Sequence, residues 1–330
     1  MTDIRYDVTA IGNAIVDILG RCDDAFLAKH GAPKGHMRLV DAGTIDTLYG
    51  AMGPGIEISG GSAANTAVGV ASLGGRAAFI GKVADDAFGK IFRHDITSAG
   101  VAFTTPAISG RAPTSSSLIL VTPDGERTMN TFLGISTELD TSDVDAGLIA
   151  QSAVIYLEGY LFDQPAAKAA FRQAVAIAKT AGRKVALTLS DGFCVDRHRA
   201  EFLDLIRSGI DVVFANEAEI TSLYETADFD DAAARIARDT KLAVLTRSAK
   251  GSLILSDGAS HSIPVAPVPG VVDTTGAGDL YAAGFLFGLT NGRDLPTAGR
   301  IGSLAAAEII SHIGARPAIS LAELAQSRGL

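Results

Sequence analysis

The chain contains little cysteine and no excess of basic residues, and each shortage excludes a class of protein. Among its 330 residues only Cys22 and Cys194 are cysteines, far apart and in no C-x-x-C pair. Neither a disulfide framework nor a thiolate metal site is indicated, and a reducing compartment is expected. The formal net charge is -9, which leaves no basic excess to displace counterions from nucleic-acid phosphates. The expected partners are therefore small molecules, not nucleic acids.

Long apolar stretches are also missing. The apolar segment LYAAGFLFGL (280–289) is too short to span a bilayer, and the first residues show no cationic stretch followed by a long apolar core. Hydrophobic residues make up 47% of the chain and charged residues only 20%, which indicates a well-buried globular protein. We expect a cytoplasmic protein that does not bind a membrane.

Two common phosphate-binding motifs are absent. The glycines at 276 and 278 begin a G-x-G-x-x-G pattern, but Tyr281 stands where the third glycine is needed, which excludes a dinucleotide-binding fingerprint. Lys82 and Lys90 follow glycines without the upstream glycine and the downstream hydroxyl of G-x-x-x-x-G-K-[ST], so the sequence has no P-loop. Any phosphate site in this chain must be of another kind.

Short apolar segments alternate along the chain with longer alanine-rich segments of helical spacing. Strands are expected at 7–13, 77–83, 153–160, 184–190, 211–216 and 242–248, and helices at 163–182 and 197–209. The alternation predicts the α/β fold class, with a mostly parallel sheet covered on both faces. The length of 330 residues suits one large domain with an appendage.

One region breaks this alternation. Residues 114–134 contain two β-type runs on either side of Pro123, Asp124 and Gly125, which predicts a hairpin. Together with residues 35–43, the hairpin is expected to form a small second sheet. In an α/β enzyme such a sheet usually covers the ligand crevice as a lid.

The segment DTTGAGD (273–279) poses a chemical question, because the carboxylate of Asp279 follows two glycines at the start of an apolar run. We expect a strand to end near Asp273 and a helix to begin at about Gly276, which would present free backbone N–H groups at the edge of the sheet. Glycines at 276 and 278 would let a phosphate approach closely. The alternative is a simple capped helix, in which Thr275 or Asp279 satisfies the unpaired donors.

Four segments resemble the motifs of one known family. DTTGAGD resembles the C-terminal signature of the ribokinase-like carbohydrate and nucleoside kinases, also called the phosphofructokinase-B family, and GGSAANTAVGVASLGG (60–75) resembles their N-terminal signature. NEAE (216–219) is similar to their N-x-x-E motif, and TRSAKGSL (246–253) to the segment near their adenine site. The resemblance implies a single ribokinase-like domain over 1–330, with a three-layer α/β/α core and a β-sheet lid formed by segments of about 18–50 and 104–135.

The resemblance also implies an ATP-dependent kinase that uses Mg²⁺. Asp279 would be the general base, and the backbone of Gly276, Ala277 and Gly278 would form an anion hole for the transferring phosphoryl group. Glu219 would hold Mg²⁺ through water. The implied ATP-binding residues are Asn216, Thr246, Arg247, Gly251 and Arg127. Without the family context, Asn216 and Glu219 are typical of a helix cap, and Arg127 is equally typical of a solvated surface charge.

The acceptor side is implied by the N-terminal half of the chain. The residues expected to bind acceptor hydroxyls are Asn13, Asp17, Gly61, Ser62 and Asn65, a mixture of donors and acceptors that a vicinal diol needs. Tyr160 and Phe193 offer flat surfaces for a purine. The plainer alternatives are that Asn13 and Asp17 form turns and that Tyr160 and Phe193 are ordinary core residues.

Some relatives bind a monovalent cation beside the anion hole through backbone carbonyls of two loops. Asp273, Thr275 and the loop at 311–318 resemble that arrangement, but Ala318 stands where some relatives have a hydroxyl ligand, so K⁺ is a possible further cofactor. The function implied is phosphorylation of the primary (5') hydroxyl of a ribonucleoside, with bacterial adenosine kinases as the best match. The alternatives are a sugar kinase for ribose, fructose or a related sugar, and a non-catalytic nucleoside or nucleotide sensor. A monomer or a homodimer is expected.

Overall fold

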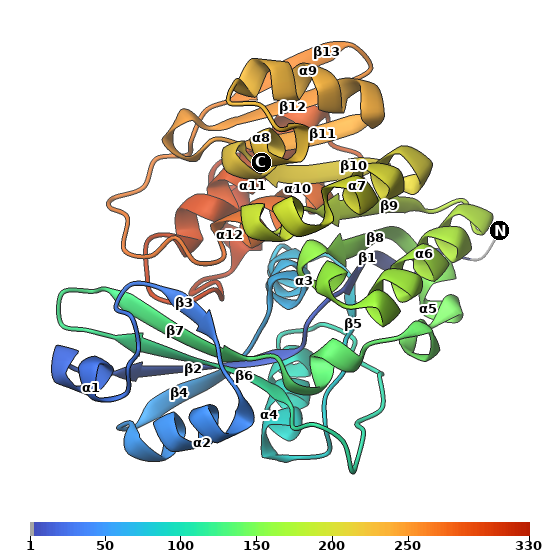
Figure 1. Cartoon of the computed structure of the whole chain (residues 1–330). Helices are drawn as coiled ribbons and strands as arrows, with labels where there is room; N and C mark the ends of the chain where they lie inside the picture. Colours follow the sequence, from blue (N-terminus) through green and yellow to red (C-terminus); the bar gives the residue numbers. More distant parts are fainter. Residues whose placement is uncertain (1–2) are drawn as a thin grey trace.

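The computed structural model describes residues 3–330 and has the predicted α/β architecture (Figure 1). Its centre is an eight-stranded sheet of order β13-β12-β11-β10-β9-β8-β1-β5. The parallel strands are β1 (Tyr6–Ile11), β5 (Ala77–Ile80), β8 (Ser152–Glu158), β9 (Lys184–Thr188), β10 (Val212–Asn216) and β11 (Leu242–Thr246), and the antiparallel strands β12 (Ser252–Ser256) and β13 (Ala259–Ile263) complete one edge. Each of the six strands predicted from the sequence is confirmed.

The large sheet is buried on both faces, which makes it the middle of three layers. In β10, Val212 and Phe214 enter one hydrophobic cluster while Val213 and Ala215 enter the other, as the two-residue period of a strand requires. One face carries α3 (Ser62–Ser72), α4 (Ala87–Ser98), α10 (Ala277–Thr290), α11 (Leu295–Ile309) and α12 (Leu321–Ser327). The other carries α5 (Ala146–Ala150), α6 (Pro165–Thr180), α7 (Gly192–Gly209), α8 (Glu217–Tyr224) and α9 (Phe229–Asp239).

The helix predictions hold for α6 and α7, but the strand expected to end near Asp273 is wrong. Helix α7 begins earlier than predicted because Asp191 caps it, accepting from the backbone N–H groups of Phe193 and Cys194. After β13 the chain runs without regular structure to α10. Proline interrupts this segment at positions 264, 267 and 269, and proline cannot donate to a strand ladder.

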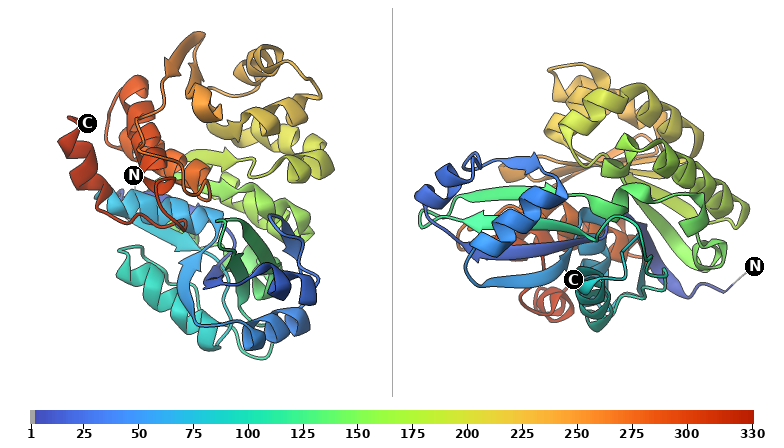
Figure 2. Two further views of the ribbon diagram at one scale, coloured as in Figure 1. Left: turned by 90° about the vertical axis from the view of Figure 1, so that its left-hand side faces the viewer. Right: turned by 60° about the horizontal axis from the view of Figure 1, so that its bottom comes forward.

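A second sheet of five strands, in the order β3-β7-β6-β2-β4, projects from one end of the larger body (Figure 2). Its strands are β2 (Ile15–Arg21), β3 (Met37–Leu39), β4 (Gly55–Gly60), β6 (Ser115–Val121) and β7 (Arg127–Phe132), and the short helices α1 (Asp24–Lys29) and α2 (Ala42–Ala51) accompany it. The predicted hairpin is confirmed, because β6 pairs with β7 in antiparallel fashion. Strands β2 and β4 were not anticipated, so this small sheet extends beyond residues 18–50 on both sides.

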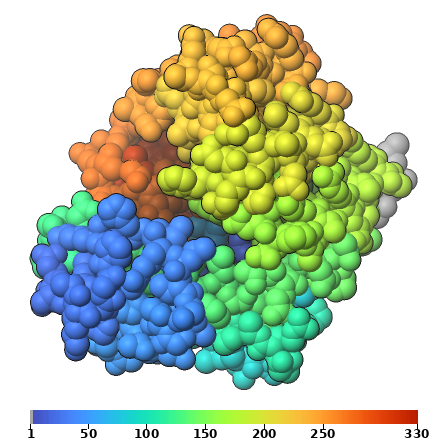
Figure 3. Space-filling model, viewed as in Figure 1, coloured from blue at the N-terminus to red at the C-terminus, as the bar shows by residue number. Residues whose placement is uncertain are grey.

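The space-filling view is hollowed between the small sheet and the main body (Figure 3). The chain passes between the two parts from β1 to β2 and from β4 to α3. Single 3₁₀ turns complete the connections: η1 (Gly134–Glu138), η2 (Thr141–Asp143), η3 (Gly159–Asp163) and η4 (Ser248–Lys250). Among residues 3–330, no helix has both the length and the apolar character needed to cross a membrane.

Helices α10 and α11 approach each other closely because glycine lies at their contact. A Cβ added to Gly284 would lie 2.7 Å from the backbone N and Cα of Gly302, and one added to Gly288 would lie 2.7 Å from the Cα of Ala298. Backbone atoms cannot rotate away as a side chain can. The position of α10, which carries Asp279 at its first turn, therefore depends on these glycines.

We predict that Gly284→Ala lowers the free energy of unfolding by about 1–3 kcal/mol, the usual effect of overpacking a close contact. Chemical denaturation of the variant beside the parent chain measures this. The matched control is Gly50→Ala, at a helical glycine of α2 whose added Cβ would meet nothing within 4 Å. The control should be neutral or stabilising, because alanine has the higher helix propensity. Equal stability for parent and Gly284→Ala would show that the two helices can separate without cost.

Candidate active site

The first turn of α10 carries the predicted anion hole. Gly276 is the N-cap with φ +78°, and a Cβ at this position would lie 3.0 Å from that of Ala315, so glycine is required there. The N–H of Ala277 donates to the Thr274 carbonyl at 3.2 Å, whereas within residues 3–330 the N–H groups of Gly278 and Asp279 have no acceptor. A Cβ on Gly278 would meet no atom within 4 Å. Two donors without an acceptor among the described residues therefore lie at a helix N-terminus, and there is open space beside Gly278, as an anion site requires.

Asp279 is held by two side chains of α3. The Ser62 hydroxyl donates to its Oδ1 at 2.6 Å, and the Asn65 amide donates to its Oδ2 at 3.0 Å. Burial raises the pKa of Asp279, and the hydrogen bonds from Ser62 and Asn65 and the charge of Arg316 oppose that rise. The Asn65 Oδ1 is buried and has no partner in the described part of the chain. That orphaned acceptor, beside a fixed carboxylate, is suited to a ligand hydroxyl.

A buried acid that the sequence analysis missed connects the other acceptor residues. Glu158, at the end of β8, accepts from the Asn13 amide at 2.6 Å and from the backbone N–H of Ala63 at 2.8 Å. Burial raises its pKa to about 7, and these hydrogen bonds limit the rise. Gly12 leaves room for this carboxylate, because a Cβ there would lie 2.3 Å from its Oε2. The sequence does contain a signal for Glu158, because it is an acid within the otherwise apolar segment VIYLEGY (154–160).

Asp17 lies on β2, against the junction of β4 with α3. A Cβ on Gly60 would lie 2.2 Å from its Oδ2, and Gly61 has φ +99° with the Asn13 carbonyl equally close. Burial raises the pKa of Asp17 to about 7. The charges of Arg316 and Arg127 lower it, and that of Asp279 raises it further. Asp17 and Asp279 are therefore near enough to repel each other.

Arg316 is the second residue that the sequence analysis missed. It comes from the loop after α11 and donates to the Ser59 carbonyl at 2.8 Å, the Ser59 hydroxyl at 2.8 Å and the Ala64 carbonyl at 3.0 Å. Ser59 also donates through its N–H and its hydroxyl to Asp95 of α4. Nothing in the motif pattern distinguishes Arg316 from a surface arginine, so only the folded chain identifies it.

The predicted nucleotide side gathers at the ends of β10 and β11. Asn216 caps α8 in a capping box with Glu219, exchanging hydrogen bonds of 2.6 to 2.9 Å, and Thr246 lies beside Asn216 in the sheet register. Burial raises the pKa of Glu219 to about 7, and the carboxylates of Asp191 and Asp279 add to the rise. The capping role anticipated for Asn216 and Glu219 is present, and each Glu219 oxygen keeps a second lone pair.

Arg247 and Gly251 belong to the turn between β11 and β12. The Arg247 guanidinium lies 3.8 Å from the centre of the Phe229 ring and pairs with Glu217 at 3.4 Å. Gly251 has φ +82°, and a Cβ there would lie 2.0 Å from the Ile263 carbonyl. The structure thus gives both residues local packing roles in the turn next to Thr246.

Arg127, Asp273 and Thr275 form one cluster. Arg127, the first residue of β7, donates to Asp273 and, at 2.7 Å, to the Thr275 hydroxyl. Asp273 also accepts from the backbone N–H groups of Thr275 and Gly314, both at 2.9 Å. A guanidinium therefore already neutralises this carboxylate. The resemblance assigns a monovalent cation to backbone carbonyls of this segment and of the loop at 311–318, so the K⁺ site stays a prediction.

The two aromatic candidates lie on neighbouring segments and are not core residues. Tyr160 is 40% exposed and Phe193 is 75% exposed. The Cys194 thiol donates to the Gly159 carbonyl at 3.3 Å, so the segments that carry the two rings are neighbours. An apolar ring so exposed at the end of a parallel sheet is available to stack on a ligand.

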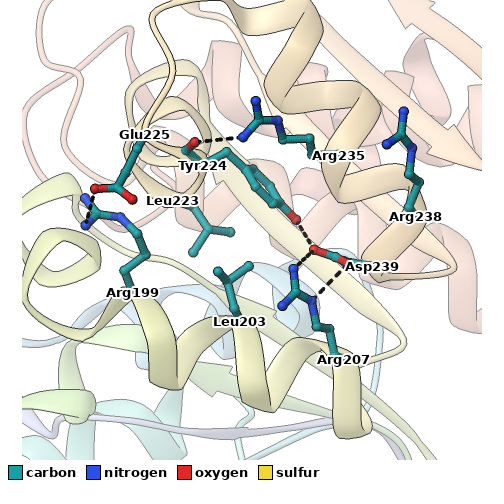
Figure 4. Close-up of a pocket in the computed structure, with 9 residues that line it drawn as sticks. All are labelled: Arg199, Leu203, Arg207, Leu223, Tyr224, Glu225, Arg235, Arg238 and Asp239. Atoms are coloured by element: carbon teal, nitrogen blue, oxygen red, sulfur yellow. Dashed lines mark hydrogen bonds and ion pairs between the residues drawn. The ribbon is translucent and has the colours of Figure 1, made fainter.

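A separate pocket of about 340 Å³ lies between α7, α8 and α9 (Figure 4). Its arginines mostly connect these helices: Arg207 pairs with Asp239, which also accepts from the Tyr224 hydroxyl, and Arg199 pairs with Glu225. None of the predicted site residues lines it. The pocket is a junction of ion pairs and is distinct from the candidate active site.

Comparison with known proteins agrees with this geometry. The model of the pfkB family carbohydrate kinases matches residues 57–321. The crystal structure of an adenosine kinase from Sinorhizobium meliloti is 55% identical, covering 98% of this chain and 99% of that one, with a TM-score of 0.91. A probable sugar kinase from Rhizobium etli CFN 42 is 51% identical over 99% of both chains, with a TM-score of 0.92.

A sugar-acid kinase is also similar to this chain. The 5-dehydro-2-deoxygluconokinase of Shouchella clausii is 29% identical over 331 residues, covering 97% of this chain and 94% of its own length. The relatives thus include kinases named for a nucleoside and for sugars. The family model spans most of the chain, including α3 and the first turn of α10, so the chain belongs to the pfkB family of carbohydrate kinases.

Proposed function

We propose that this kinase transfers the γ-phosphoryl group of ATP to the primary 5' hydroxyl of a ribonucleoside, with adenosine as the foremost candidate. The observation that carries the proposal is Asp279, a carboxylate fixed by Ser62 and Asn65 beside two unpaired backbone N–H groups. A non-catalytic sensor has no use for a base next to its anion site. The similarity to the adenosine kinase at 55% identity supports the nucleoside as acceptor.

The chemistry assigned to the chain is alignment and proton acceptance. Asp279 accepts the proton of the acceptor hydroxyl as its oxygen attacks the γ-phosphorus, and the bond to the β,γ-bridging oxygen of ATP breaks. Each Asp279 oxygen keeps a lone pair beside its hydrogen bond from α3. The N–H groups of Gly278 and Asp279 stabilise the charge on the transferring group.

Mg²⁺ would neutralise phosphate charge when bound with ATP. Burial and the neighbouring carboxylates Asp191 and Asp279 raise the pKa of Glu219, so this region favours a cation. Glu219 has free lone pairs for metal-bound water, and Asn216 orients it. Within residues 3–330 no group of three or more His, Cys, Asp or Glu side chains is arranged to hold a metal directly, so the proposed contact is through water.

The acceptor would lie between α3 and the small sheet. Asp17, Asn13 and Asn65 offer both donors and acceptors for ribose hydroxyls, while Tyr160 and Phe193 would hold the base. The small sheet acts in this proposal as a lid that excludes water from the transfer site. A sugar kinase is the second candidate, favoured by the buried Glu158 and Asn13 pair and by the similarity to sugar kinases.

Replacing the base should reduce the chemical step. We predict that Asp279→Asn lowers kcat by roughly 10² to 10⁴, because the proton acceptor is lost, while the Kd of the acceptor changes little. Single-turnover phosphoryl transfer and calorimetric acceptor binding measure the two effects. The control is Asp294→Asn, at a carboxylate that only caps α11. Near-normal turnover of Asp279→Asn would mean that Asp279 is a helix cap alone.

The acceptor class can be tested at Phe193. We predict that a purine nucleoside has a much higher kcat/KM than ribose or fructose, and that Phe193→Ala reduces kcat/KM for the nucleoside roughly 5- to 100-fold, since stacking on one base contributes about 1–3 kcal/mol. The control is Ile4→Ala. Ile4 is an exposed apolar residue just before β1, so it lies at the amino end of the parallel strands, whereas Phe193 follows the carboxyl end of β9. If a free sugar proves to be the better substrate, the nucleoside proposal is wrong and the protein is a sugar kinase.

The pKa of Asp17 predicts a stability effect of unusual sign. Its folded pKa, about 7, is above that of an unfolded aspartate, so ionisation costs folding stability as the pH rises from 4 to 7, and the whole cost is present above pH 7. Asp17→Asn removes this cost. We expect a Tm about 6 °C above the parent at pH 8 and close to it at pH 4, with a raised KM for the acceptor.

Thermal unfolding across this pH range tests the prediction about Asp17. The control is Asp41→Asn, because the Thr44 hydrogen bond lowers the pKa of Asp41. Its ionised form stabilises the fold above the unfolded pKa, so this variant should lose stability at pH 8 and progressively less as the pH falls below about 4. A Tm difference for Asp17→Asn that is the same at pH 4 and pH 8 would show that ionisation of Asp17 is not its cause.

A further inference from the structure

We propose that Arg316 is a positioning residue of the transfer site, which holds the β4–α3 junction in place and brings a positive charge to the catalytic carboxylate. The inference rests on the proposed function and adds to it a residue that no motif marks. Arg316 lies on the loop after α11, yet its three hydrogen bonds all go to residues 59 and 64. The role of Arg316 therefore follows from the two elements that these hydrogen bonds connect to its loop.

The guanidinium spans both sides of a junction between the small sheet and the main body. Ser59 belongs to β4 of the small sheet, and Ala64 belongs to α3 of the main body. Between them lie Gly60 and Gly61, and Gly61 has φ +99°, a conformation that glycine adopts without strain. Arg316 fixes the relative position of two elements that would otherwise meet at a flexible pair of glycines.

The residues on the two sides of this junction contact the reacting groups. Ser62 and Asn65, in the first turn of α3, hold the two oxygens of Asp279. Asp17 lies against Gly60. A shift at the junction would therefore change the distance between Asp17, which is proposed to bind the acceptor substrate, and the base Asp279. Positioning errors of about 1 Å at such a site reduce rates strongly.

Arg316 also supplies a positive charge that acts on two acids of the site. It lowers the pKa of both Asp17 and Asp279 against the effect of burial. Burial lowers its own pKa to about 10, and Asp95, Asp17 and Asp279 oppose that change. It stays protonated at neutral pH. The other titratable and charged groups that interact with Asp279 or Asp17 are Tyr156, Glu158, Tyr160, Glu219 and Arg127.

The test separates charge from hydrogen bonding. Arg316→Met keeps an unbranched apolar side chain but removes the charge and the three hydrogen bonds, and Arg316→Lys keeps the charge but cannot make three fixed hydrogen bonds. We expect Arg316→Met to reduce kcat/KM for the acceptor roughly 10²- to 10³-fold and to move the acid limb of its pH profile up by about one unit. In Arg316→Lys the acid limb of the pH profile should lie close to that of the parent enzyme, while the KM for the acceptor should rise.

Further measurements exclude a merely structural role. The KM for ATP should change less than about threefold in both variants, and guanidinium ion should restore part of the activity of Arg316→Ala. Ser59→Ala is a milder variant that removes one of the three hydrogen bonds of Arg316 together with the bond from the Ser59 hydroxyl to Asp95. It should raise the acceptor KM without moving the acid limb. The matched control is Arg93→Lys, since Arg93 donates to the carbonyls of Phe103 and Thr105 and to no residue of the site.

An unchanged acid limb in a folded Arg316→Met, or an ATP KM that rises as much as the acceptor KM, would overturn the inference. These outcomes leave the proposed function intact, because that function depends on the parent enzyme. If the parent enzyme transfers no phosphoryl group to any nucleoside or sugar, the proposed function fails. The stability profile of Arg316→Met, compared with Arg93→Lys, shows whether any loss of activity reflects unfolding.

Discussion

Mutual repulsion among buried carboxylates is the constraint on which the site depends. Asp17, Glu158, Glu219 and Asp279 come from four different elements, and burial raises the pKa of each of them. Asp279 raises the pKa of the other three. Such a group of acids remains ionised only if donors and cations are arranged around it. The chain provides amide donors, helix N-termini and the charges of Arg316 and Arg127.

The compensating groups also determine how the two sheets meet. Glu158 connects the end of β1 to the start of α3, since it accepts from Asn13 and from Ala63. Arg127 connects β7 of the small sheet to Asp273 before α10. Arg316 connects the last loop of the chain to β4 and α3. The contacts of Arg127 and Arg316, which bring positive charge to the site, therefore also join the small sheet to the main body.

The sequence predicted the large sheet well and its polar connections poorly. Apolar runs such as residues 211–216 have a period of two and bury both faces, so pattern alone identifies them. Segments at a sheet edge give less signal. Strand β4 is mostly exposed or half-buried, and the segment before Asp273 was taken for a strand although prolines interrupt it. The motif resemblance predicted Asp279 and Asn65 as site residues. Glu158 and Arg316 could not be predicted in this way, because they join the site through long-range contacts: Glu158 to Ala63, 95 positions away, and Arg316 to Ala64, 252 positions away.

This separation in the sequence has a physical reason. A base at a helix N-terminus needs only a local turn, so its signature is a short continuous motif that a reader can recognise. A residue that neutralises several acids from different elements has no local requirement beyond its own charge and reach. Arg316 satisfies that requirement from the C-terminal loop, which Gly276 allows to approach the helix closely through Ala315. The glycine that the motif makes conspicuous thus serves two purposes: it caps the helix that carries the proposed anion hole, and it admits the loop that carries the compensating charge.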